Sequence, residues 1–301
     1  MPTEGPGKRS FFKYAAPDTV LAFLKNRTVR YSSPLTFNDP FDVQVGLHFD
    51  FDLNALHRKV LDRLCELATA PTEPQVETTD PWGQLVLLVR QHYPAHGFPH
   101  DRWETMTAEV FGWLVNEIQT TQRQVQEHWR NTLLPGVRVF CVSEDRDNLL
   151  MWAHYARDHT GAVLEFLSLP DEDNPLSVAR PVIYVDHPPP FFTEAEWLDD
   201  ILSVRKSNLT DLSRRYVYSK SMHWSYEREW RVWYPRIPAP ERLYDDMPIR
   251  QSEFAGLYIG CKAEESFAAE AISLAHRAFP NARMYRARKI EDDYALEYAE
   301  I

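Results

Sequence analysis

Residues 52 to 134 interrupt a chain that otherwise mixes short strand-like and helix-like segments, and this interruption limits the folds open to it. Within it, apolar residues recur three or four positions apart, which is the spacing of one helix face. The longest run places an apolar stripe, including Met106 and Val110, between Trp103 and Trp129. The Pro-Gly pair at 135–136 would end it. We therefore predict that 52–134 is a helical insertion.

The flanking segments, 1–51 and 135–301, are expected to form one composite α+β core domain. No regular strand-helix-strand rhythm and no GxGxxG motif occurs, which favours a mixed or antiparallel sheet over a doubly wound one. Asp18 would cap its helix. Strands are expected at 28–33, 137–143, 160–166, 180–186, 224–235 and 255–260 and around 283–287 and 292–298, and helices at 18–26, 147–158, 194–219 and 263–278.

The charge balance bears on partners and location. The 301 residues carry a formal net charge of -11, which argues against a general phosphate-backbone binder. No apolar run is long enough to span a bilayer or to act as a signal peptide, so we expect a cytoplasmic protein without a membrane partner. A nucleic-acid acceptor could bind a local basic patch, which could equally be the solvated face of a helix. The patch is Arg205, Lys206, Arg214 and Arg215.

The stretch WSYEREWRVWYP at 224–235 is the main candidate for chemistry. In a strand, Glu227 and Glu229 would share one face, about 6.5 to 7 Å apart. If buried, at least one of these carboxyls should titrate at a raised pKa. Such a pair can orient a sugar hydroxyl and stabilise positive charge at an anomeric carbon. The alternative is a solvent-exposed strand face with salt bridges, in which Glu229 pairs with Arg231 or with a neighbouring strand.

The loop sequence FNDPFD supplies Asn38, Asp39 and Asp42 directly after an expected strand. Binding residues are often held on such loops. The alternative is turn formation, because Asn and Asp before Pro bond their own backbone. Two carboxylates without a companion motif are weak support for a cation, so we predict no metal site.

The segment LLMWAHYARDHTG places Trp152 and Tyr155 three apart on a helix, with His154 beside them. They could form an aromatic wall for a planar ring, or an aromatic stripe packed into the core. Lys220, just before the glutamate pair, could neutralise a phosphate or a carboxylate, or simply face solvent.

Six segments together resemble an uncharacterised bacterial family, domain of unknown function twenty-nine seventy-one. They are KY at 13–14, YSSPLTFNDPFD, VFCVSED, NLLMWAHYARDHTG, KSMHWSYEREWR and LYIG. Members of that family resemble accessory and effector genes of bacterial defence and mobile elements. The resemblance implies a defence or toxin effector without an established activity.

The order of motifs is also similar to that of ADP-ribosyltransferases, which have a basic first strand, a helix, a serine-bearing second strand and a later ExE. Lys13 (or Arg9) and Tyr14 would lie on the first strand, Ser32 and Ser33 at the end of the second. The resemblance implies a split sheet and cleavage of the nicotinamide-ribose bond of NAD as co-substrate.

The same resemblance implies residue roles. Glu229 would hold a ribose hydroxyl and stabilise the oxocarbenium-like transition state, and Glu227 would position or deprotonate a protein or nucleic-acid acceptor. Lys13 would contact NAD, Ser32 would brace the carboxylate, and Tyr155 or Trp152 would stack on a ring. The other residues expected at the cofactor are Tyr14, Ser33, Asn38, Asp39, His154 and Lys220.

Two other classes stay open. A metal-dependent nuclease or phosphohydrolase would use Asp39, Asp42, His154 and Glu229. A non-catalytic protein would use the aromatic-rich loops to bind a nucleotide or a partner without turnover.

Overall fold

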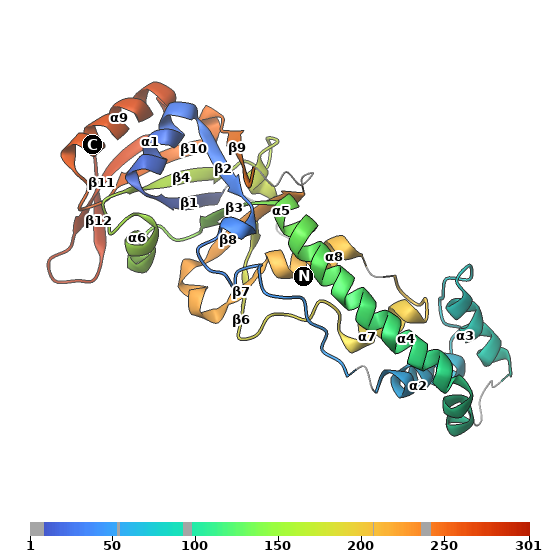
Figure 1. The fold of residues 1–301 in the computed structure, drawn as a ribbon. Helices are drawn as coiled ribbons and strands as arrows, with labels where there is room; N and C mark the ends of the chain where they lie inside the picture. The colour runs from blue at the N-terminus through green and yellow to red at the C-terminus, as the bar shows by residue number, and fades with distance from the viewer. Residues whose placement is uncertain (1–8, 53–54, 93–97, 207, 236–241) are drawn as a thin grey trace. The chain divides into compact units, whose positions relative to one another are not determined.

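The computed structural model describes residues 9–52, 55–92, 98–206, 208–235 and 242–301, which belong to two compact units (Figure 1). The first unit comprises Met1–Gln44, Leu133–His187 and Tyr218–Ile301. The second comprises Val45–Thr132 and Pro188–Val217. The second unit thus begins at 45 and includes 188–217, residues that were predicted to belong to the core domain.

Ten strands of the described chain form one open sheet in the first unit. The order is β12-β11-β10-β4-β1-β3-β2-β9, and β8 pairs with β3 and β5. Only β10 and β11 run parallel within it, so the chain is of mixed α/β type with a mixed, open sheet. The strands are β1 (Arg9–Ala15), β2 (Thr28–Ser32), β3 (Val137–Ser143), β4 (Ala162–Ser168), β5 (Arg180–Pro181), β8 (Glu229–Pro235), β9 (Tyr244–Pro248), β10 (Phe254–Ile259), β11 (Arg283–Lys289) and β12 (Leu296–Glu300).

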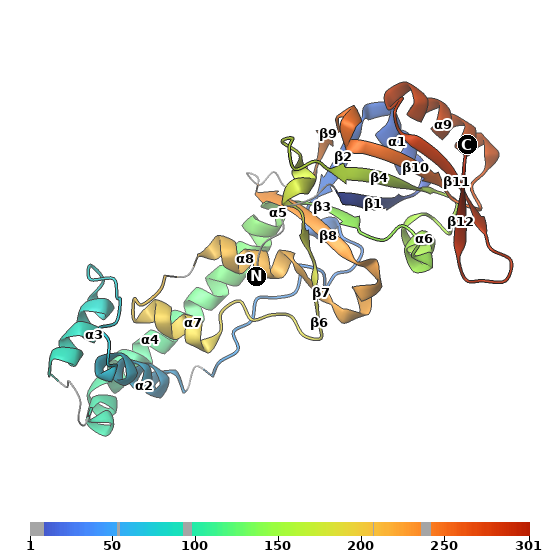
Figure 2. The same cartoon turned by 180° about the vertical axis from the view of Figure 1, so that it is seen from behind.

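Helices cover both faces of this sheet (Figures 1 and 2): α1 (Pro17–Asn26) and α9 (Glu265–Ala278) on one face, α6 (Leu149–Tyr155) on the other. Pro17 starts α1 because its fixed φ suits the first helical position, and Arg27 ends it in the left-handed conformation with φ 53°. Asp18 lies in the first turn, so the prediction that it caps the helix is wrong; Ala16 holds the cap position.

Strand alternation supplies both layers of the core. In β1, Phe11 and Ala15 enter the cluster beneath α1 and α9, whereas Phe12 and Tyr14 join Trp152 of α6 on the opposite face. Because successive strand side chains point to opposite faces, one strand serves two cores. Side chains therefore pack against both faces of β1.

β3 pairs very unevenly with its neighbours. It pairs with β8 along its whole length. It pairs with β1 only at Ser143, opposite Phe12, and with β2 only at Val139, opposite Ser32. Between Val139 and Ser143, β3 therefore separates from both strands. This separation makes room for side chains within the plane of the sheet.

Short elements complete the first unit. β6 and β7 form a separate parallel pair, so the strand predicted at 180–186 is in fact divided between the two sheets. The short elements are η1 (Pro34–Thr36), α5 (Leu134–Gly136), η3 (Pro175–Val178), β6 (Ile183–Val185), β7 (Ser219–Ser221), η4 (Met222–Glu227) and η5 (Gln251–Glu253).

The second unit is helical: α2 (Leu56–Thr69), α3 (Pro81–His92), α4 (His100–His128), the π-helical turn η2 (Trp129–Leu133), α7 (Glu194–Ile201) and α8 (Leu209–Val217). The helix predicted over 194–219 is two helices, α7 and α8. α4 buries Phe111 and Ile118, but Met106 and Val110 of the predicted stripe are exposed. Three residues of the basic patch pair with acids of this unit: Lys206 with Asp80, Arg214 with Asp211 and Arg215 with Glu196.

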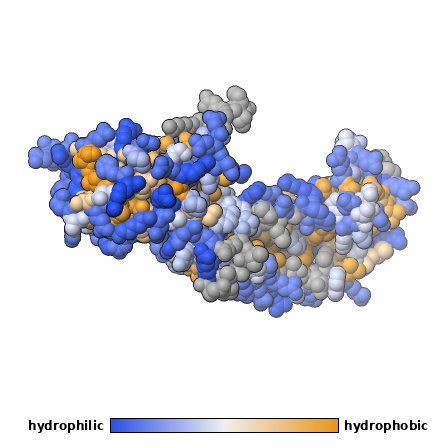
Figure 3. Space-filling view, turned by 90° about the horizontal axis from the view of Figure 1, so that it is seen from above, coloured by the Kyte–Doolittle hydropathy of each residue, from blue (hydrophilic) through white to orange (hydrophobic). Residues whose placement is uncertain are grey.

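The surface seen in Figure 3 is mostly hydrophilic with smaller hydrophobic areas. Among the described helices, none is both long enough and apolar enough to cross a bilayer.

Candidate functional site

A pocket of about 390 Å³ opens where β3 separates from β1 and β2. Its walls come from these three strands, the segment that follows β2, helix α6, and side chains between Lys220 and Glu229. Segments far apart in sequence thus contribute to one hollow within the first unit.

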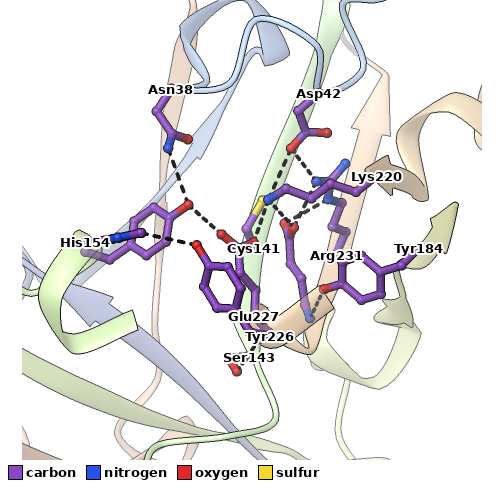
Figure 4. Close-up of polar contacts among 12 residues, drawn as sticks. Asn38, Asp42, Cys141, Ser143, His154, Tyr184, Lys220, Tyr226, Glu227 and Arg231 are labelled. Carbon is purple, nitrogen blue, oxygen red and sulfur yellow. Dashed lines mark hydrogen bonds and ion pairs between the residues drawn. The ribbon is translucent and has the colours of Figure 1, made fainter. Parts of the chain in front are cut away.

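Lys220 lies at the centre of a buried group of charges at this pocket (Figure 4). Its ammonium donates to Glu227 Oε2 at 2.5 Å and Glu229 Oε2 at 3.0 Å, and lies 3.5 Å from Asp42 Oδ2. Arg231 donates to Glu229 Oε1 at 2.8 Å and Oε2 at 2.9 Å, and to Asp42 Oδ2 at 2.7 Å. None of the five side chains is more than 7% exposed. We call these five residues the charge cluster.

Glu227 and Glu229 reach Lys220 by a backbone route that strand alternation does not predict. β8 begins only at Glu229, and Glu227 is the last residue of η4. Arg228 between them is left-handed, with φ 44°. The prediction of one continuous strand through both glutamates is therefore wrong. A single left-handed residue changes the chain direction, and it lets both carboxylates turn to the same ammonium.

Other segments fix the backbone that carries the two glutamates. Because each contact satisfies a peptide group that would otherwise lose its hydrogen bond on burial, the contacts also hold the carboxylates in place. The donors and acceptors are Asn148 Nδ2 to the Tyr226 carbonyl (2.7 Å), Ser143 Oγ to the Glu227 carbonyl (2.6 Å), and the Glu229 amide to the Tyr184 hydroxyl (2.8 Å).

The charge cluster contains three carboxylates and two cations, so it carries one excess negative charge when every group is ionised. Burial alone would raise the pKa of Glu229, but Arg231 and Lys220 outweigh it and hold this pKa well below the usual range. Burial raises the pKa of Glu227, which Lys220 offsets only in part, and it raises the pKa of Asp42, which Arg231 and Lys220 offset only in part. Glu229 is therefore a fixed anion, whereas Glu227 and Asp42 are the groups that take up a proton.

Tyr155 connects the charge cluster to the open pocket. Its hydroxyl donates to Glu227 Oε1 at 2.6 Å and accepts from Asn38 Nδ2 at 3.4 Å. Burial and the neighbouring Glu227 charge both raise the pKa of Tyr155, which keeps the hydroxyl protonated. Next to it, the Tyr226 hydroxyl shares a 3.2 Å hydrogen bond with His154 Nδ1.

Two cations line the pocket in addition to the charge cluster. Lys13 Nζ donates to the Cys141 carbonyl at 2.8 Å, and Arg30 pairs with Asp246 at 2.9 and 3.1 Å. Lys13 and Arg30 also line a second hollow of about 310 Å³ bounded by β1, β2 and α1. They therefore mark the place where the two hollows adjoin.

Most of the residues predicted from the sequence line the same pocket. They are Lys13, Tyr14, Ser32, Asn38, His154, Tyr155, Lys220, Glu227 and Glu229. The glutamate pair and the loop after β2, 189 positions apart between Asp42 and Arg231, thus meet at one site.

Three predicted residues do not line it. Ser33 Oγ donates to the Leu134 carbonyl at 2.8 Å, and Asp39 Oδ1 accepts from the Phe41 amide at 2.9 Å. Trp152 is fully buried in the core on the α6 face, so it cannot stack on a ligand. Ser33 and Asp39 shape the loop, which is the turn-forming alternative considered for this segment.

Sequence reasoning missed Tyr184 and Cys141, named Arg231 only as a salt-bridge partner of Glu229 on an exposed strand face, and considered Asp42 as part of the binding loop or as a metal ligand. A signal existed for Arg231, because it lies two positions after Glu229 on β8 and so shares its face. No local pattern indicated Tyr184, whose role depends on a contact 45 positions away.

Among the described residues, no three His, Cys, Asp or Glu side chains are grouped so that they could hold a metal ion. Asp39 is bound to a backbone amide, and Asp42 and Glu229 are both bound to Arg231. These contacts give the nuclease alternative no particular support.

A family model described as "Protein of unknown function (DUF2971)" matches residues 151–232. The match spans most of α6, Lys220 and both glutamates of the charge cluster, and it supports an uncharacterised domain of unknown function. No curated protein and no solved structure matches the chain.

Proposed function

We propose that the pocket is the active site of a NAD-consuming enzyme, similar to ADP-ribosyltransferases, that cleaves the bond between nicotinamide and ribose. One observation carries the proposal: Glu227 and Glu229 share Lys220 at the wall of a pocket that also contains Ser32 and Lys13. These are the residue types, in the order along the chain, on which the resemblance rests.

The charges of the pocket suit such a ligand. NAD carries a positive pyridinium ring on one ribose and a negatively charged diphosphate beyond it. The charge cluster supplies excess negative charge, while Lys13 and Arg30 supply positive charge where the second hollow adjoins. Opposite charges attract more strongly in a partly buried pocket than in water, so this arrangement favours one orientation of the ligand.

The fixed negative charge of Glu229 suits cleavage of the bond between nicotinamide and ribose. When the bond breaks, its electron pair moves to the pyridinium nitrogen, nicotinamide leaves neutral, and positive charge develops at the ribose carbon. Glu229 is held in place by Arg231 and Lys220 and stays ionised, so its negative charge needs no reorganisation during the reaction. Stabilisation of developing charge by such fixed groups is a large part of catalysis.

The sheet also suits the proposal. A basic strand, a helix and a serine-bearing strand precede the glutamates, and β3 separates from β1 and β2 as a split sheet requires. The helical second unit lies outside this order of elements and is not needed for the pocket, which is lined by the first unit alone.

The test measures nicotinamide release from NAD by the wild-type protein, Glu229→Gln and Glu227→Gln. We expect each substitution to lower kcat by roughly 100-fold or more, because each removes negative charge from a preorganised site. Glu253→Gln is the matched control. Glu253 is also a buried, ion-paired glutamate, bound to Arg250 and Asn174, but it does not line the pocket.

A wild-type protein that releases no nicotinamide would reject the proposal. Retention of full activity by a folded Glu229→Gln protein would remove Glu229 from its assigned role.

A further inference from the structure

The two glutamates of the charge cluster accept from different donors: Arg231 and Lys220 at Glu229, but Lys220 and the Tyr155 hydroxyl at Glu227. Both oxygens of Glu227 are engaged, Oε1 by the Tyr155 hydroxyl at 2.6 Å and Oε2 by Lys220 at 2.5 Å, and the side chain is only 3% exposed. Tyr155 is less buried and lines the pocket. A molecule that enters therefore meets the tyrosine hydroxyl before it meets the carboxylate.

We propose that the second substrate of the reaction is a neutral hydroxyl compound, water in the simplest case, and that Tyr155 passes its proton to Glu227. This inference rests on the proposed cleavage of NAD and names the acceptor of the ribosyl group. It makes Tyr155 a catalytic residue, a role beyond the ring stacking that the sequence suggested.

The hydrogen-bonding capacity of Tyr155 favours a hydroxyl acceptor. A phenol has one proton to donate and two lone pairs that accept. Tyr155 donates its proton to Glu227, and one lone pair receives the long 3.4 Å contact from Asn38. The other lone pair can accept a hydrogen bond from an incoming O–H group. That bond adds to the network without breaking any part of it.

A cationic nucleophile fits less well. An amine or guanidine would need an acidic oxygen, and to reach Glu227 it would have to displace either Tyr155 or Lys220. It would also place a third positive charge beside Lys220 and Arg231, which already occupy the acidic oxygens of Glu229.

Attack of water on the ribose carbon is coupled to proton transfer through Tyr155. The oxygen of water donates an electron pair to the ribose carbon as the bond to nicotinamide breaks, and that bond's electrons neutralise the pyridinium nitrogen. The water proton moves to the Tyr155 oxygen while the phenolic proton of Tyr155 moves to Glu227 Oε1. Nicotinamide and ADP-ribose leave, and Glu227 returns its proton to solvent. The raised pKa of Glu227 brings it closer to the working pH, which suits a general base.

The experiment follows nicotinamide release and the accompanying products with NAD alone, with methanol and with agmatine, a small guanidine. The wild-type protein should form ADP-ribose, a methyl riboside in methanol, and no agmatine adduct. Tyr155→Phe should lower kcat roughly 100-fold with KM for NAD unchanged within about twofold, because a proton relay acts in the chemical step. The solvent deuterium isotope effect on kcat should shrink in the same variant.

Tyr298→Phe is the matched control. Tyr298 packs in the same aromatic cluster as Tyr155, but its hydroxyl donates to the Arg146 carbonyl at 3.2 Å and it does not line the pocket. It should keep the wild-type kcat and isotope effect.

Agmatine adducts, or an unchanged kcat in Tyr155→Phe, would overturn the inference and leave the proposed function standing. Absence of nicotinamide release from the wild-type protein would overturn both. If Tyr155→Phe does not fold, the wild-type product distribution and isotope effect decide the question by themselves.

Discussion

Two buried arginines of the first unit, Arg231 and Arg138, have entirely different partners although both are fully buried. Arg138 donates to the backbone carbonyls of Pro135, Val137 and Arg242 at 2.7, 3.0 and 2.5 Å, and its Nε lies 3.4 Å from Asp245. Arg231 binds carboxylates, those of Glu229 and Asp42.

The difference distinguishes a charge that supports the fold from a charge in the proposed active site. Three of the four groups described beside Arg138 are backbone carbonyls, which cannot take up a proton; the fourth is the Asp245 carboxylate. The surroundings of Arg231 contain three carboxylates, two of which have raised pKa values. A buried charge that only supports a fold needs neutral acceptors or one partner, whereas an excess of acid is costly and is expected at functional sites.

The largest expected effect comes from removing each arginine. Arg231→Met leaves the carboxylates of the charge cluster with Lys220 alone, and we expect it to lower the free energy of unfolding by about 3 to 5 kcal/mol. Arg138→Met leaves three carbonyls unbonded, but Asp245 keeps its contacts with Arg242 and the Tyr234 hydroxyl, so we expect a cost of about 1 to 3 kcal/mol. Urea denaturation at pH 7 measures both.

Acid should distinguish the two variants further. Part of the stability lost in Arg231→Met should return as the pH is lowered, because protons can then neutralise the buried carboxylates that have lost Arg231. The loss in Arg138→Met should change much less. An equal response of both variants to acid would remove the distinction between the two arginines.

A smaller effect is expected in the pH dependence of stability. Because the pKa of Glu227 is raised on folding, its contribution is fully present below the ordinary carboxyl pKa of 4.5 and is lost as the pH rises through the raised value. The stability of the wild-type protein relative to Glu227→Gln should therefore fall as the pH increases. Denaturant midpoints at stepwise pH above 4.5 provide the measurement. A difference that grows with pH would mean that the pKa of Glu227 is lowered.

The smallest effect concerns two left-handed arginines, Arg228 in the site and Arg27 at the end of α1. Valine at either position should cost about 1 to 2 kcal/mol, because a branched side chain disfavours this conformation. Only Arg228→Val should also lower nicotinamide release, since Arg228 lies between the paired glutamates. Thermal unfolding and the release assay together test this. Equal activity of both valine variants would show that the turn at Arg228 is dispensable for alignment.

Much of the first unit could be read from local patterns. The short apolar runs at β3, β4 and β10 predict strands that are buried on both faces, and the structure places buried strands there. β2 was also predicted, although its burial alternates along the strand. The loop after β2 and the glutamate pair were also recognisable, because both are dense in polar groups beside strand-forming residues.

Other features depend on tertiary contacts that no local pattern encodes. The left-handed turn at Arg228 is stabilised by surrounding bonds, and a residue that is not Gly gives no sequence signal for it. The ion pair between Asp42 and Arg231 and the hydrogen bond from the Glu229 amide to the Tyr184 hydroxyl join positions far apart in the chain. Met106 and Val110 of α4 are exposed. Helical periodicity thus predicted an apolar helix face, but it could not predict whether other residues pack on that face.

The single points of pairing between β3 and each of β1 and β2 have a further consequence for evolution. Where strands diverge, peptide groups of β3 border the hollow, as the Cys141 carbonyl does when it accepts from Lys13. Main-chain atoms survive any exchange of side chains. Ligand binding through main-chain atoms therefore tolerates substitutions. Related chains can keep these backbone contacts while the side chains that line the pocket change, and the changed side chains can select different ligands.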